Sequence, residues 1–133
     1  MDKAVLAARI LLGLAFLVFG LDFFFHVMPM PESMPTEEGM AFLEALMATG
    51  YLFQLVKAVE IIGGILLIAG FFVPLALLLL APVVVNITLY HAVLDTNGLT
   101  ISLVLLALYL VVAWGYRTAW TPILTPKLRP ADG

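Results

Sequence analysis

Residues 54–70 read QLVKAVEIIGGILLIAG, an apolar segment that carries two opposite charges, Lys57 and Glu60. A charged side chain in the hydrocarbon core of a membrane costs several kcal/mol, roughly 2.5–3.5 on insertion scales, so intramembrane charges usually face a partner or a wet cavity. With the residues just before it, the segment is long enough to cross a bilayer, which takes about 20 residues. Lys57 and Glu60 are therefore the first candidates for function.

The composition around this segment is that of a membrane protein. Hydrophobic residues make up 64% and charged residues 11% of the 133 residues, whereas a soluble domain has about 45–50% and about 25%. Residues 61–94 and 96–116 carry no Asp, Glu, Lys or Arg. The length suits one membrane domain over residues 1–133 and no second domain.

The apolar runs predict four membrane spans, and so an all-α fold in the form of a four-transmembrane-helix bundle. The expected spans are residues 4–27, 51–70, 74–94 and 99–120, followed by a tail at 121–133. The start of the chain resembles a signal peptide, but no A-x-A-like site follows the first apolar run, so we expect it to remain as a span.

One short helix is expected between the first and second spans. Pro29 and Pro31 end the first span, because proline cannot continue a helix. Thr36 then predicts an N-cap, and the acidic residues at 37 and 38 suit the first turn of a helix over residues 37–48. That helix is too short to cross the bilayer, so we expect it at the membrane interface.

Charged residues predict the orientation. Four spans put both termini on one side, which holds all the basic residues outside the second span, Lys3, Arg9, Arg117, Lys127 and Arg129. The charged residues on the other side are all acidic, and they are Glu32, Glu37, Glu38, Glu44 and Asp95. The positive-inside rule therefore places both termini in the cytoplasm. We expect the chain in the cell (inner) membrane.

Polar side chains from three spans are expected at one depth, in the outer half of the bundle. They are Asp22 and His26 of the first span, Gln54, Lys57 and Glu60 of the second, and Asn86, Tyr90 and His91 of the third. At about 100° per residue the three of the second span share one face. A pocket open to the outer side would explain this layer, and we take these eight residues as candidate ligand-binding residues.

Each of these groups also has a structural interpretation. Lys57 and Glu60 form either a structural pair or a site that handles protons or binds a head group. Asn86 and Tyr90 either bond between helices or line the pocket, and His91 lies about 140° from Asn86, so the two need not share a site. Asp22 and His26 can contact each other at i,i+4.

Metal sites and nucleic-acid partners are not expected. The chain has no cysteine, which excludes disulfides and Cys-ligated metals, so a redox role would need a bound cofactor. The histidines and carboxylates match no metal motif, and we assign no metal site. The net charge is −3 without a basic cluster, so nucleic acid is not expected as a partner.

Three stretches carry a resemblance to a known family. They are Arg9-Ile10-Leu11-Leu12-Gly13 with Phe19-Gly20, then Glu60-x-x-Gly63-Gly64-x-Leu66-Leu67-x-x-Gly70, then Pro82-Val83-Val84-Val85-Asn86-Ile87 with Tyr90-His91. Together they resemble the DoxX family of small four-span bacterial membrane proteins. Some members are membrane subunits linked to thiosulfate:quinone oxidoreductase and others belong to redox-stress complexes. The resemblance marks Glu60, Asn86 and His91. Members of the family often have Lys after the glycine of the first span, whereas here the sequence reads Gly20-Leu21-Asp22. This difference argues against direct transfer of thiosulfate chemistry to this chain.

These observations lead to one expected function and two alternatives. We expect a redox-associated subunit that binds a quinone or similar amphiphile, with Glu60 exchanging a proton, and at most the membrane subunit of a quinone-linked oxidoreductase. The alternatives are a non-enzymatic protein that binds or transports a lipid, small solute or ion, and a membrane anchor for a soluble enzyme. Any glycines left over after bundle formation, among Gly13, Gly20, Gly63 and Gly70, would suit a homodimer.

Overall fold

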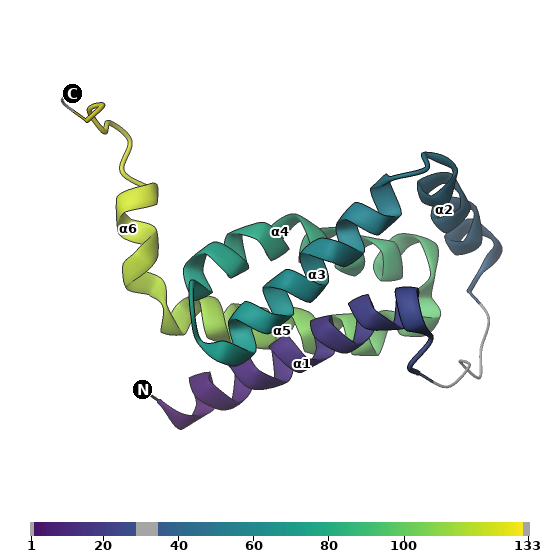
Figure 1. The fold of residues 1–133 in the computed structure, drawn as a ribbon, viewed down its shortest axis with the longest axis horizontal. Coiled ribbons are helices and arrows are strands. Elements are labelled where there is room, and N and C mark those ends of the chain that lie inside the picture. The colour runs from purple at the N-terminus through teal and green to yellow at the C-terminus, as the bar shows by residue number, and fades with distance from the viewer. Residues whose placement is uncertain (1, 29–34, 132–133) are drawn as a thin grey trace.

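The computed structural model describes residues 2–28 and 35–131, and these residues form helices and no strand. The elements are α1 (Lys3–Phe25), α2 (Glu37–Ala48), α3 (Leu52–Ala69), α4 (Val73–Leu89), the π-helix η1 (Tyr90–Leu94), the 3-10 turn η2 (Thr96–Gly98), α5 (Leu99–Gly115), the 3-10 turn η3 (Arg117–Ala119) and α6 (Trp120–Ile123). Figure 1 shows α1, α3, α4 and α5 running lengthwise, with both termini at one end and α2 at the other. We call these the terminal end and the α2 end.

Four helical segments are long and apolar enough to cross a membrane. They are Lys3–Phe25, Leu52–Ala69, Val73–Leu94 and Thr96–Gly115. Large apolar side chains point outward from every one of them, for example Leu11, Ile65, Leu75 and Val104. An outer surface of this kind is stable in lipid, where apolar side chains need no cover from water. The all-α four-span bundle is therefore confirmed, and the protein is a multi-pass membrane protein.

Two spans end differently from the expectation. The fourth was expected to reach residue 120, but α5 ends at Gly115, and α6 leads away from the bundle (Figure 1). Tyr116 lies at the break, where its hydroxyl accepts a hydrogen bond from Arg9 Nη1 at 3.0 Å. The first span was expected to reach residue 27, but α1 ends at Phe25 because His26 adopts the left-handed conformation, φ 51°. Pro29 and Pro31 lie outside the described residues.

Helix α1 packs most closely against α3, and glycines make this possible. A Cβ added at Gly64 of α3 would lie 2.7 Å from the carbonyl oxygen of Gly13 and 2.8 Å from the amide nitrogen of Leu17. A Cβ at Gly20 would lie 3.0 Å from the carbonyl oxygen of Lys57. The two backbones therefore touch at both ends of the contact, as small residues allow in membrane helices.

The remaining glycines named as dimer candidates are also used within the bundle. A Cβ at Gly63 would meet Leu80 of α4 at 2.8 Å, and one at Gly70 would meet the guanidinium of Arg9 at 3.0 Å. Gly13 and Gly20 are taken up by α3. All four glycines therefore make close contacts within the bundle, so none is left over for a homodimer interface, and the homodimer itself stays a prediction.

Helix α2 forms over the expected residues. The Thr36 hydroxyl accepts a hydrogen bond from the Gly39 amide at 3.1 Å, which is the expected N-cap. The same hydroxyl donates to the carbonyl of Leu94 in η1. A Cβ at Gly39 would lie 2.7 Å from the Tyr90 hydroxyl. The start of α2 is therefore anchored to η1.

The glycine contact leads to a testable prediction. Gly64→Ala should lower the free energy of unfolding by about 1–3 kcal/mol, the usual cost of overpacking, because the methyl group meets backbone atoms that move only if α1 and α3 separate. Gly63→Ala, one residue away, meets the side chain of Leu80, which can shift, and should cost less. Unfolding by SDS in mixed micelles, followed by circular dichroism, measures both. An equal cost for the two variants would contradict this account.

Candidate functional site

The two charges of α3 form an ion pair. Lys57 Nζ lies 3.1 Å from Glu60 Oε2, at the i,i+3 spacing that brings side chains together on one face of a helix. Glu60 is 2% exposed and Lys57 19%. The Lys57 ammonium also lies 5.3 Å from the centre of the Phe53 ring, a cation–π contact. The buried carboxylate thus has a compensating charge that stays partly accessible.

A cavity of about 510 Å³ opens beside this pair, and we call it the first cavity. Its lining comes from α2, α3, α4 and η1 and is mostly apolar, including Phe42 and Leu46 of α2. Five polar side chains interrupt this apolar lining, and they are Lys57, Glu60, Asn86, Tyr90 and His91. Size and lining fit a small-molecule site, which is usually an apolar pocket with a few polar groups that fix orientation.

Helix α4 and the π-helix η1 that continues it bring Asn86, Tyr90 and His91 to this cavity. Pro82 lies inside α4 and has no N–H to donate. The chain then widens into η1, where the Asp95 amide donates to the carbonyl of Tyr90, five residues back, at 2.9 Å. A regular helix would place Asn86 and His91 about 140° apart, yet here both line one cavity. Such π turns are frequent at functional sites.

A smaller cavity of about 330 Å³ lies between α1, α4 and α5, and we call it the second cavity. Asp22 of α1 and Ser102 of α5 line it, together with Lys57, Glu60 and His91. The last three line both cavities. The Lys57–Glu60 pair therefore belongs to the wall that divides them.

Two of the eight candidate residues line neither cavity. Gln54 is exposed on α3, and His26 is exposed after the end of α1. His26 follows the last helical residue, and its main-chain amide donates to the Asp22 carbonyl at 2.8 Å, whereas the expected contact was between the two side chains. Asp22 Oδ1 instead accepts a hydrogen bond from the Met28 amide at 2.8 Å.

The other histidine has a backbone partner. His91 Nδ1 lies 2.9 Å from the main-chain oxygen of Asp95. The ring packs against Gly98, where an added Cβ would lie 2.3 Å from Cε1. Within residues 2–28 and 35–131 no group of three or more His, Cys, Asp or Glu side chains lies close enough to hold a metal ion.

Sequence reasoning missed two contributions to the site. Ser102 is 1% exposed, and its hydroxyl donates to the carbonyl of Leu99. The only signal in the sequence was that Ser102 is one of few polar residues in an apolar span. The apolar face of α2 was visible in the sequence, but its role as one wall of the first cavity depends on how Gly39 docks against η1.

A family model described as DoxX matches residues 4–92. The match includes α1 to α4, the Lys57–Glu60 pair and the candidate residues of η1. No curated protein and no solved structure matches the chain.

The ion pair predicts a coupling between its two members. Lys57→Met should lower the free energy of unfolding by about 2 kcal/mol, less than the roughly 3–5 kcal/mol of a fully buried pair, because Lys57 is partly exposed. Replacing Glu60 as well removes the unpaired carboxylate, so the double variant with Glu60→Met should recover most of the loss. SDS unfolding of both single variants and the double variant gives the coupling energy. If the two losses simply add, the pair has no energetic coupling.

Proposed function

The chain belongs to the DoxX family, and from that premise we propose that it binds a quinone or similar amphiphile in the first cavity and acts as a redox-associated membrane subunit. The observation that carries the proposal is the buried Lys57–Glu60 pair in the wall of an otherwise largely apolar cavity. Intramembrane ionisable groups commonly mark substrate or ion pathways.

The polar groups of the first cavity suit a ring with carbonyl oxygens. A quinone carbonyl accepts hydrogen bonds, and Lys57, Asn86 and Tyr90 can donate them. The Asn86 amide and the Tyr90 hydroxyl make no hydrogen bond to the described part of the chain, so both are available to a ligand. Glu60 is the group that would exchange a proton with the ligand.

The apolar part of the cavity suits the ligand's tail. Leu55 of α3 is 54% exposed and Leu79 of α4 is 42% exposed, and both line the first cavity. Because exposed apolar residues of a membrane span face lipid, the lining continues from the ion pair to the lipid-facing surface of α3 and α4. This favours an amphiphile that keeps its tail in the bilayer while its head group reaches Lys57.

In a redox role, this chain would bind the quinone and supply protons, and a partner protein would supply the electrons. Reducing a quinone takes two electrons and two protons. The chain has no cysteine, and we assign electron supply to a soluble redox enzyme, with Glu60 handling protons. In this view the protein is at most the membrane subunit of a quinone-linked oxidoreductase.

We also propose the orientation that the charges favour. Both termini lie at one end of the bundle in Figure 1. The basic residues of that end, with the acidic residues of the α2 end, favour a cytoplasmic location for the termini in the inner membrane. The first cavity then lies in the outer half of the bilayer.

A second candidate function is lipid head-group binding without chemistry. A zwitterionic head group carries one positive and one negative charge, and the Lys57–Glu60 pair presents the complementary charges at the wall of the cavity. This candidate shares the site but requires no redox partner. Analysis of bound molecules separates the two.

The proposal predicts what copurifies with the protein. Ultraviolet absorption and mass spectrometry of an organic extract should reveal a quinone at a near-equal molar ratio to the protein. A specific lipid in its place would favour the head-group function, and an extract with neither would contradict the proposal in favour of a membrane anchor.

The proton role predicts a rate effect. Glu60→Gln should retain bound quinone but slow its reduction by an added chemical reductant about 100-fold, the lower range for loss of a general acid. The matched control is Glu44→Gln, the same change at an exposed glutamate of α2, which should behave as wild type. Stopped-flow ultraviolet absorbance follows the reaction. Reduction at the wild-type rate in Glu60→Gln would overturn the proton role.

A further inference from the structure

We propose that the second cavity is a water-filled passage that connects Glu60 to the aqueous phase at the α2 end, separate from the ligand chamber formed by the first cavity. The proposal rests on the proposed function in one respect, the assignment of Glu60 as the group that exchanges a proton. It adds a route for that proton and a role for Asp22 that does not involve touching the ligand.

The lining of the second cavity favours water. Of its ten lining residues, five carry ionisable or hydroxyl side chains, and these are Asp22, Lys57, Glu60, His91 and Ser102. Empty cavities in proteins are apolar, whereas polar cavities with room for water hold it through two to four hydrogen bonds per molecule. A volume of about 330 Å³ leaves room for several waters.

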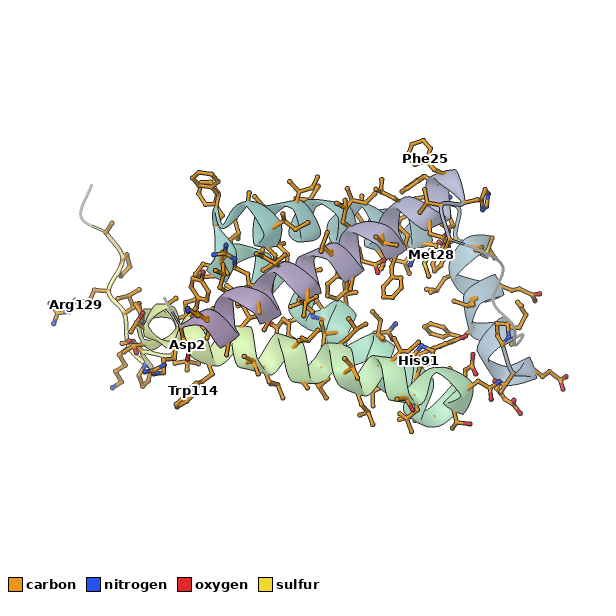
Figure 2. The ribbon with its side chains drawn as sticks, turned by 90° about the horizontal axis from the view of Figure 1, so that it is seen from below. Asp2, Phe25, Met28, His91, Trp114 and Arg129 are labelled. Carbon is orange, nitrogen blue, oxygen red and sulfur yellow. The ribbon has the colours of Figure 1, made fainter. Side chains whose placement is uncertain are left out.

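The place of the cavity in the bundle favours exchange at the α2 end. Asp22 lies in the last turn of α1, and Gly98 lies in the turn before α5. Figure 2 shows His91 at the same end of the bundle as Phe25 and Met28, with Asp2 and Arg129 at the opposite end. Asp22 Oδ1 is bonded to the Met28 amide, while Oδ2 has no hydrogen bond to the described part of the chain and can bind water.

The ionisable groups that line this cavity together with Glu60 come from three elements. Asp22 comes from α1, Lys57 from α3 itself and His91 from η1, while α5 adds only the Ser102 hydroxyl. His91 is held through Nδ1 by the Asp95 carbonyl oxygen. Because Glu60 borders both cavities, it can receive a proton from one side and present it on the other.

The absence of cysteine allows a direct test of water access. Single cysteines are introduced by Ser102→Cys in the second cavity, Val83→Cys in the first, and Ala76→Cys as a buried control that lines neither. Each variant in lipid nanodiscs is treated with a small charged methanethiosulfonate, and labelling is followed by mass spectrometry. The Ser102→Cys variant should react at least tenfold faster than the Ala76→Cys variant.

A ligand then separates the two chambers. A short-chain, fully substituted benzoquinone, which does not add to thiols, should protect the cysteine at 83 and leave labelling at 102 unchanged. A cysteine at 102 as inert as that at 76 would overturn the water-filled passage. Protection at both positions would overturn the separation of the chambers. Lack of protection at 83, with rapid labelling at 102, would count against the quinone site while supporting the passage.

Two further variants keep the test decisive. Leu105→Cys probes the same cavity if the change at Ser102 disturbs folding. Asp22→Leu, added to the Ser102→Cys variant, should slow labelling about tenfold by removing the carboxylate that holds water, and should slow quinone reduction without lowering the quinone content. Unchanged labelling and reduction in the Asp22→Leu variant would remove Asp22 from the passage.

Discussion

The backbone contact between α1 and α3 is the constraint on which the rest of the structure depends. Gly13 and Gly64 let the two helices touch at one point and Gly20 lets α1 approach the carbonyl of Lys57 at another. No hydrophobic force drives helices together in lipid, so such close packing has to supply much of the stability. The contact also fixes α3 in rotation, which turns Lys57 and Glu60 toward the two cavities.

With α3 fixed in this way, one ion pair serves two spaces of different character. The first cavity is largely apolar and reaches the lipid-facing side chains of α3 and α4, whereas half of the lining of the second is polar. A side chain that exchanges protons between an apolar ligand and water needs such a position between two cavities. The Lys57 ammonium offsets the cost of keeping the Glu60 carboxylate there, which a lone buried charge could not sustain.

The sequence predicts the spans and α2 well because long apolar runs and the Thr36 cap are local signals. The site is less predictable because it depends on how the helices pack. Asn86 and His91 line one cavity because its lining follows a wide arc of α4 and η1, through Ile87 and Tyr90, and periodicity alone does not give the width of a cavity. The left-handed conformation of His26 ends α1 early, so Asp22 bonds Met28 instead. Gln54 shares a face with Lys57, but periodicity does not tell which part of a face a neighbouring helix covers.

The Thr36 hydroxyl links the cap of α2 to the carbonyl of Leu94 in η1. If α2 swung away together with Thr36 to admit a ligand from water, the carbonyl of Leu94 in the π turn would lose that donor. Exchange through the gap between α3 and α4 leaves both bonds intact. Occupancy of the first cavity would then follow the mole fraction of the ligand dissolved in the bilayer and would be insensitive to its concentration in the surrounding fluid.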